Sequence, residues 1–268
     1  MKTWTISNQK GGVGKTTTVV TLAGLLSVQG KKVLCIDMDS QGSLTSYFRL
    51  DPDSIEKSIY NLFKDSSDNA VLEPLNYIQK TSFEGLDILP ASTALATLDR
   101  QASQFKGLGL VLSQVLSKLE KTYDVVLIDS PPMLGVLMIN ALAACDHLIV
   151  PVQTEFLAIK GLDRMIKTLN MIQKSRQKVL NYLIVPTMYD KRTRASISSL
   201  NTLNNKYAAN LWHSYIPVDT QLRDASGIGV PAPIMSPRSR AVVAYGELLK
   251  TLQKDKTRLA LVSGKGCL

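Results

Sequence analysis

The chain has 268 residues, of which 45% are hydrophobic and 20% charged, a composition that is typical of a globular protein and excludes a disordered or fibrous one. Its 31 lysines and arginines exceed its 22 aspartates and glutamates, which gives a net charge of +9. Residues 1–150 carry a net charge of −2 and residues 151–268 a net charge of +11. This asymmetry favours an anionic partner for the second half, although a solvated surface would also explain it.

Strand and helix patterns alternate along the chain. Short apolar runs predict strands and apolar residues at helical spacing predict helices. In chain order we expect a strand at 3–7, a helix at 15–29, strands at 33–37 and 86–89, a helix at 108–118, strands at 125–129, 148–150 and 183–185, and helices at 157–173, after 193 and at 242–254. The stretch 51–85 is more polar and less periodic, which suggests an excursion from the sheet.

This alternation indicates an α/β fold with a mainly parallel sheet covered by helices on both faces. We expect one domain over residues 1–268, with a short irregular tail at about 255–268. No uninterrupted run of 18 apolar residues occurs and the N-terminus lacks a signal-peptide layout, so we expect neither a membrane span nor secretion. Three scattered cysteines argue against a disulfide framework and favour the cytoplasm.

A glycine-rich loop follows the first expected strand and opens the first expected helix. Such a loop turns backbone N–H groups toward phosphate oxygens at a helix N-terminus. Lys15 would reach the terminal phosphates and the Thr16 hydroxyl would bind Mg²⁺. A glycine turn without a ligand is the alternative, which the strand–loop–helix context disfavours. The nucleotide-binding residues predicted here are Gly11, Gly12, Val13, Gly14, Lys15, Thr16 and Thr17.

The run Lys-Gly-Gly-x-Gly-Lys-Thr departs from the standard pattern, which has glycine in place of Gln9. This deviant form resembles the ParA/MinD family of deviant Walker ATPases, and the resemblance covers about residues 2–252. It implies a P-loop NTPase fold, ATP and Mg²⁺ as cofactors, slow ATP hydrolysis stimulated by a partner, and a homodimer in the ATP-bound state. By the same match, Lys10 reaches the phosphates bound by the other subunit, which would couple dimerisation to catalysis.

Carboxylates at two strand ends complete the expected site. Asp129 ends an apolar strand, and Asp37 and Asp39 end another. We expect Thr16, Asp37 and Asp129 at the magnesium ion, and the resemblance implies that Asp39 orients the attacking water. The predicted catalytic set is therefore Lys10, Lys15 and Asp39. Any single aspartate at a strand end could instead cap a helix or form a turn.

The resemblance also assigns residues of the second half. It places adenine between Thr187 and Met188 on one side and Pro217, Val218 and Asp219 on the other. Glu155 becomes a candidate for contact with the other subunit's nucleotide. A glutamate at the rim without a partner is the alternative.

Within the family, the ParC branch fits best. That branch places chemotaxis arrays at the poles of polarly flagellated bacteria, together with the adaptor ParP and a polar landmark protein. The segments that look like ParC are 134–144, 153–158, 185–196 and 216–226. The alternative is a plasmid or chromosome partition ParA, which shares the chemistry and differs in cargo. A redox enzyme of the nitrogenase iron-protein type would need cysteine pairs in glycine-rich loops, which are missing here.

DNA binding is the open question that separates these cargoes. Partition ParA proteins bind DNA without sequence preference through basic residues, and no base-reading motif occurs here. The family arginine before Leu222 aligns with Gln221, which leaves an acidic partner or a solvated surface as alternatives. The tail is too short and irregular for a stable membrane anchor, so we expect a cytoplasmic protein at the cell pole or on the nucleoid. The candidate DNA-binding residues are Lys191, Arg192, Arg194, Arg223, Arg238 and Arg240.

Overall fold

The computed structural model describes residues 1–67, 72–101, 110–175 and 179–254. The expected strands and helices are confirmed where they fall within these ranges, and residues 108–109 of one expected helix lie outside them. The elements are β1 (Lys2–Ile6), α1 (Lys15–Val28), β2 (Val33–Asp37), α2 (Ser43–Tyr47), α3 (Ile59–Ser67), η1 (Pro74–Tyr77), β3 (Gln79–Lys80), β4 (Leu86–Leu89), α4 (Leu95–Gln101), α5 (Val111–Lys118), β5 (Val125–Asp129), α6 (Val136–Ala144), β6 (His147–Gln153), α7 (Phe156–Ser175), β7 (Asn181–Thr187), α8 (Arg194–Tyr207), α9 (Gln221–Ile228), α10 (Ala232–Met235) and α11 (Arg240–Lys254).

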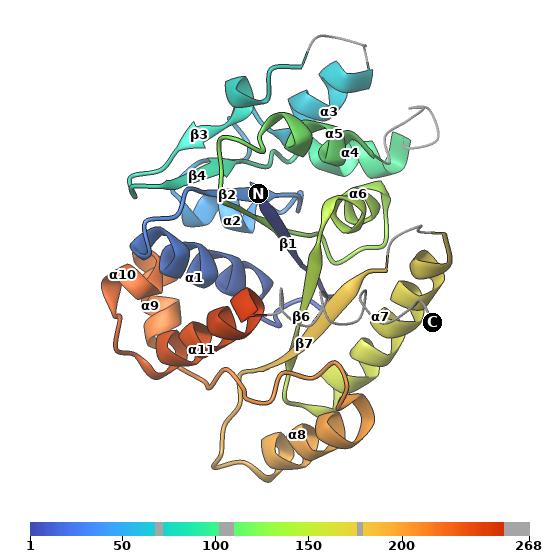
Figure 1. The fold of residues 1–268 in the computed structure, drawn as a ribbon, viewed down its shortest axis with the longest axis vertical. Helices are drawn as coiled ribbons and strands as arrows, with labels where there is room; N and C mark the ends of the chain where they lie inside the picture. Colours follow the sequence, from blue (N-terminus) through green and yellow to red (C-terminus); the bar gives the residue numbers. More distant parts are fainter. Residues whose placement is uncertain (68–71, 102–109, 176–178, 255–268) are drawn as a thin grey trace, which may run out of the picture.

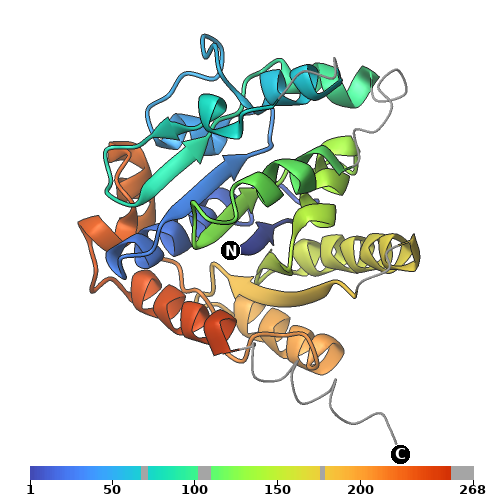
Figure 2. The same ribbon diagram turned by 45° about the horizontal axis from the view of Figure 1, so that its top comes forward.

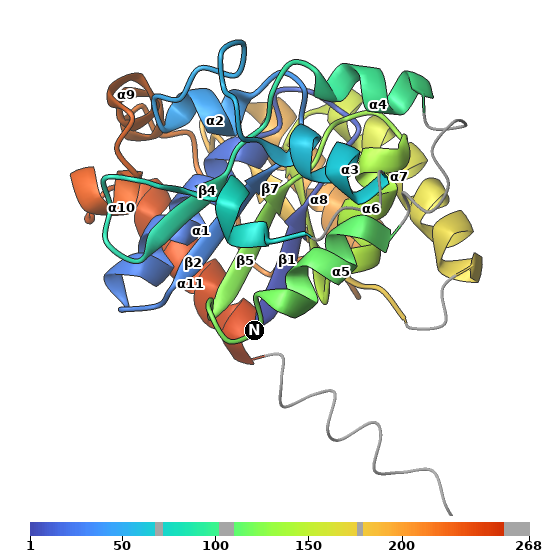
Figure 3. The same ribbon diagram turned by 90° about the horizontal axis from the view of Figure 1, so that it is seen from above.

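A seven-stranded sheet in the order β3-β4-β2-β5-β1-β6-β7 forms the centre of the molecule. Six strands are parallel, and β3 pairs antiparallel with β4 at one edge. Figure 3 shows β4, β2, β5 and β1 side by side. The stretch 51–85, expected as an excursion, therefore returns to the sheet and supplies its outermost strand.

Helices cover both faces of the sheet because its strands are apolar on both sides. In β2, Val33 and Cys35 pack in the cluster with α1 and α11, whereas Leu34 and Ile36 pack in the cluster with α3 to α6. On the same face as α3 to α6, the helices α7 and α8 pack against β6 and β7. Figure 1 shows α1, α9, α10 and α11 together on one side of the sheet and α6 and α7 on the other. The expected α/β architecture is confirmed.

The strand order positions the site. The parallel strands β1, β2 and β5 end at the same edge, where Asp37 of β2 lies in register with Asp129 of β5 and Ile6 of β1 also pairs with Asp129. The glycine loop leaves β1 at this edge and runs into α1. Two acidic strand ends thus lie beside the phosphate loop, at the crevice where open parallel sheets bind ligands.

Candidate nucleotide site

The glycine loop leaves an anion-binding surface open. Gly12 and Gly14 have φ of 73° and 90°, a left-handed conformation that favours glycine. A Cβ atom at Gly11 or Gly12 would meet no atom within 4 Å. Among the described residues, no side chain caps α1, and its first turn contains no acidic residue. The backbone N–H groups at this helix end are therefore available to phosphate oxygens.

Buried side chains fix the loop from beneath. Asn8 donates from Nδ2 to the carbonyl of Pro151 at 2.8 Å and accepts from the Lys10 N–H at 3.0 Å. Thr187 donates to the carbonyl of Val13 at 2.9 Å. The Thr187 hydroxyl at the end of β7 thus supports the loop backbone, and its predicted contact with adenine stays a prediction. The supporting role of Asn8 was not predicted, although its place at the start of the glycine-rich motif could have suggested it.

The metal end of the site contains an unsatisfied acceptor. Thr16 donates to Oδ2 of Asp129 at 2.6 Å, while Oδ1 of Asp129 is buried and has no hydrogen-bond partner within the described ranges. The buried hydroxyl of Ser7, the residue directly after β1, also lacks a partner within those ranges. Orphaned oxygens are costly unless a cation or water occupies the space beside them. Thr16 and Asp129 therefore fit a hydrated Mg²⁺ bound to phosphates.

Asp37 anchors the neighbouring loop. Its Oδ2 accepts hydrogen bonds from the N–H and the hydroxyl of Thr45, both at 2.8 Å, and its Oδ1 accepts from the N–H of Asp39 at 3.1 Å. Asp39 itself is half-buried and caps the N–H of Gln41 at 3.0 Å. Asp37 thus holds Asp39 at the rim of the site, a role that sequence reasoning did not separate from metal binding.

The electrostatics of this edge favour a cation. Burial raises the pKa of Asp129 and the charge of Asp37 raises it further, while the Thr16 hydrogen bond and the charge of Lys15 lower it. Burial also raises the pKa of Asp37, against the hydrogen bonds that it accepts from Thr45 and Asp39. Two adjacent carboxyls in an apolar setting are more stable with a proton or a divalent cation between them.

Lys10 forms an ion pair within its own subunit. Its Nζ contacts Oε1 of Glu155, and the two side chains are 29% and 40% exposed. Gly161 on α7 lies beside the Lys10 stem, since a Cβ there would be 3.8 Å from the Cβ of Lys10. Gln9 donates to the Thr168 hydroxyl of α7 at 3.3 Å. The two residues expected at a subunit interface are therefore brought together in one subunit, next to α7.

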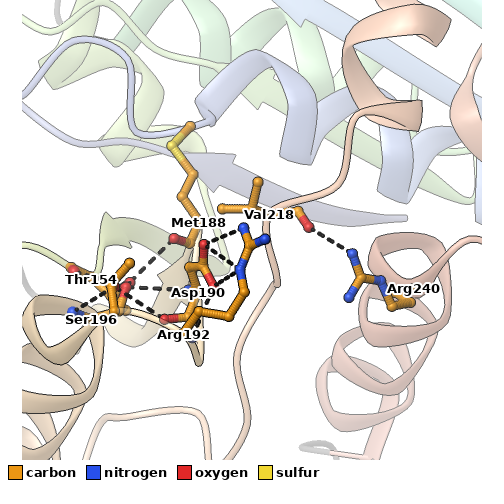
Figure 4. A network of polar contacts seen from close by, with 8 residues as sticks. Thr154, Met188, Asp190, Arg192, Ser196, Val218 and Arg240 are labelled. Carbon is orange, nitrogen blue, oxygen red and sulfur yellow. Dashed lines mark hydrogen bonds and ion pairs between the residues drawn. The ribbon is translucent and has the colours of Figure 1, made fainter.

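The loop after β7 and the loop before α9 are joined by backbone hydrogen bonds between Tyr189 and residues Ile216 and Val218, and both loops line a cavity of about 460 Å³. Tyr189 and Tyr215 line it with ring centroids 4.0 Å apart. Met188, labelled in Figure 4, has a φ of 52° and is not among the lining residues. A Cβ atom at Gly14 would lie 4.0 Å from the Met188 Cε. The predicted adenine and DNA residues that line the cavity are Pro217, Val218, Asp219, Lys191, Arg192 and Arg240.

The six candidate DNA-binding side chains are all exposed, but they are not equally available. Arg192 pairs with Asp190 through two nitrogens, at 2.7 and 2.9 Å, and lowers the pKa of that carboxyl to about 2 (Figure 4). Arg240 approaches the Val218 carbonyl at 3.5 Å. The others lie on separate segments: Lys191 and Arg194 around the start of α8, Arg223 on α9 and Arg238 before α11.

Asp219 and Gln221 have structural partners. Asp219 accepts from the N–H groups of Gln221 and Ala241, at 3.1 and 3.0 Å, and so joins the starts of α9 and α11. The Gln221 side chain accepts from the Ser236 hydroxyl at 2.7 Å. The position that carries a family arginine is therefore occupied here by a side chain bonded within the chain.

Known proteins are similar to this chain over most of its length. An AAA domain family model matches residues 1–182. The chain is 35% identical over 246 residues to the sporulation initiation inhibitor protein Soj of Bacillus subtilis, covering 91% of this chain and 95% of Soj. It is 30% identical over 254 residues to the chromosome partitioning protein ParA of Myxococcus xanthus, covering 94% and 88% of the two chains.

A solved structure shares the fold closely. Cobyrinic acid a,c-diamide synthase from Mycobacterium smegmatis, with a bound ATP analogue and magnesium, superposes with a TM-score of 0.82 at 32% identity, covering 96% of each chain. The similarity in fold is thus accompanied by similarity in sequence over almost the whole of both chains. The chain belongs to the ParA/MinD family of AAA-domain ATPases.

Proposed function

We propose that this chain is a switch that binds ATP with Mg²⁺, dimerises, hydrolyses the nucleotide and thereby positions a cargo in the cell. The observation that carries the proposal is the open, uncapped start of α1 beside Asp129, whose Oδ1 is buried without a partner in the described structure. The loop N–H groups and Lys15 bind phosphate oxygens, and Thr16 and Asp129 hold the metal. Bound Mg²⁺ supplies neutralisation of the phosphate charge.

Hydrolysis needs a water positioned in line with the terminal phosphate. Asp39 lies at the accessible rim and is fixed by the loop that Asp37 anchors, so it can accept a hydrogen bond from that water. Lys15, at the first position of α1, stabilises the negative charge that develops on the phosphate. These residues supply positioning and charge, which is most of what phosphoryl transfer requires of a protein.

Lys10 makes the site depend on a second subunit. In one subunit its ammonium group is paired with Glu155. Reaching phosphates bound by another subunit requires that this ion pair open, so an isolated subunit lacks the second cation at its own nucleotide. Slow turnover in the absence of a partner follows from this arrangement.

The cargo we propose is the polar chemotaxis array, reached through a ParP-like adaptor or a polar landmark protein. The four ParC-like segments support this assignment. Two features of the structure disfavour DNA as the principal partner: Gln221 is bonded to Ser236, and the charge of Arg192 is paired with Asp190.

The second candidate is a partition ATPase that binds DNA without sequence preference. It is supported by the names of the Soj and ParA relatives and by the exposed cations Lys191, Arg194, Arg223 and Arg238. Fluorescent localisation of the tagged protein separates the two. Polar foci that coincide with chemoreceptors support the first candidate. A nucleoid-wide distribution, with hydrolysis stimulated by DNA, would favour the second.

A further inference from the structure

One face of α7 carries basic and apolar side chains that the nucleotide site does not use. Successive side chains of a helix are rotated by about 100° around its axis, so seven residues of α7 project within a sector of roughly 100°. Along the axis, these seven residues span about 27 Å. We call this sector the α7 stripe. Phe156, Leu157 and Met171 are 67%, 68% and 70% exposed. The other four members, which are also exposed, are Lys160, Arg164, Lys167 and Lys174.

The stripe has an unbalanced charge. It contains four cations and no acidic residue, and none of the four forms an ion pair with a described residue. Asp163, on the same helix, lies outside the sector and pairs with Lys206 at 2.6 Å. The stripe therefore accounts for part of the +11 charge of the second half of the chain, and its charge and apolar groups are complementary to an anionic partner that also carries apolar groups.

A hollow lies beside the stripe. It measures about 260 Å³ between α7 and α8, and its lining includes Phe156, Lys160, Ala195 and the ion-paired Asp163 and Lys206. Lys160 lies over the Phe156 ring, 5.6 Å from its centre. In Figures 1 and 2, α7 and α8 lie together at the outer margin of the molecule. One side chain of a partner could enter this hollow while the rest of that partner follows the stripe.

We propose that the α7 stripe is the docking surface for an acidic α-helical segment of a partner protein. The width of the stripe matches one helix, its length matches about five turns, and its charge is complementary to a helix rich in Asp and Glu. Exposed apolar residues at both ends supply anchors for the apolar side of that helix. The proposal rests on the proposed function only for the existence of a protein partner.

Other anionic partners fit this surface less well. DNA would contact the cations but would gain little from Phe156, Leu157 and Met171. A membrane surface requires an apolar sector flanked by cations, whereas Lys167 lies at an angle between Phe156 and Met171. In the described part of the chain, no helix is long and apolar enough to cross a bilayer.

The stripe is also next to the switch residues. α7 begins one residue after Glu155, its Gly161 lies beside Lys10, and its Thr168 bonds Gln9. A helix bound along α7 would therefore contact the element that holds the Lys10–Glu155 pair. This location predicts that docking changes the rate of ATP turnover.

The test is photo-crosslinking in the source cell with p-benzoylphenylalanine at Lys167, and at exposed Lys64 on α3 as a control. The proposal expects crosslinking at Lys167 alone, to a protein segment with more acidic than basic residues and apolar residues at helical spacing. The double variant Lys160→Glu/Arg164→Glu should lower the yield at least about tenfold. Exchanging two acidic residues of the captured segment for lysine should restore it.

Matched variants separate this proposal from the proposed function. Lys57→Glu/Lys121→Glu makes the same charge change at exposed positions and should leave crosslinking at Lys167 unchanged. The purified stripe and control variants should both keep the basal ATP turnover and the ATP-dependent dimerisation of the wild type. If the wild type itself neither hydrolysed ATP nor dimerised with it, the proposed function would be refuted and the docking surface would not. The proposed docking surface would be refuted by equal labelling at both probe positions or by no labelling at Lys167. It would also be refuted if the captured segment were not acidic, or if the probe attached to DNA or lipid.

Discussion

Replacing Asp129 by Asn should stabilise the empty protein while weakening its response to the nucleotide. Asp129 is 1% exposed, neighbours Asp37 and has one unpartnered oxygen among the described residues. Burial and the Asp37 charge raise its pKa, and each unit by which the folded pKa exceeds the unfolded one costs about 1.4 kcal/mol above both values. Asparagine removes that cost and still accepts a hydrogen bond from Thr16. We expect Asp129→Asn to raise the free energy of unfolding by about 2–4 kcal/mol at pH 7 without ligand.

Urea unfolding with and without Mg-ATP measures both effects. Because the folded pKa is raised, the folded wild type holds the proton more tightly than the unfolded chain, so its stability rises as the pH falls from neutral. The advantage of Asp129→Asn should therefore vanish near pH 4. Wild type at 100 times its Kd for Mg-ATP should gain about 2.7 kcal/mol, and the variant less than half of that.

A matched control replaces a buried carboxylate that has partners. Asp87 accepts from Lys80 Nζ at 2.7 Å and from the Tyr123 hydroxyl at 2.8 Å. Asp87→Asn should therefore destabilise the protein. Asp129 would not be an unpaired metal ligand if Asp129→Asn destabilised the empty protein as Asp87→Asn does. The same conclusion would follow if Mg-ATP raised the free energy of unfolding of Asp129→Asn as much as that of the wild type.

Three further substitutions test individual contacts. Lys15→Ala should abolish ATP binding in calorimetry, and wild-type affinity would exclude Lys15 as a phosphate ligand. Glu155→Gln should free Lys10 and raise partner-independent ATP turnover about two- to fivefold, since a partly exposed ion pair contributes about 0.5–1 kcal/mol; unchanged turnover would show that the pair does not restrain Lys10. Thr187→Val removes the hydrogen bond to the Val13 carbonyl and should weaken ATP binding about fivefold, roughly 1 kcal/mol; an unaltered Kd would remove Thr187 from the loop support.

The sequence predicted those parts of the fold that depend on local pattern. The strands ending at Asp37 and Asp129 are continuous apolar runs, and the glycine loop has a spacing that defines its geometry. The elements β3, α2 and α10, each of five residues or fewer, were not predicted, and neither were the longer helices α3, α4 and α9. β3, for example, exists only through its pairing with β4.

Side-chain partners were harder to predict than positions. Thr187 was predicted beside adenine, and the contact of its hydroxyl with the Val13 carbonyl was not predicted because the two residues lie 174 positions apart in the chain. Lys10 and Glu155 are 145 residues apart, so their contact follows from the packing of α7 and not from any local signal. The six basic residues predicted as DNA contacts do not include the four cations of the α7 stripe, whose common face becomes apparent only once the exposed side of α7 is known.

In the proposed switch, Lys10 of a second subunit completes the nucleotide site. Mixing Lys10→Ala with Asp39→Ala protein tests it directly, because each variant alone lacks one catalytic group. If Lys10 acts across the dimer, the Lys10→Ala subunit of a mixed dimer has its own Asp39 and receives Lys10 from its partner. An equal mixture should then hydrolyse ATP at about a quarter of the wild-type rate, since half of the dimers are mixed and each contains one complete site. A mixture as inactive as either variant alone, under conditions where mixed dimers are seen to form, would contradict the account.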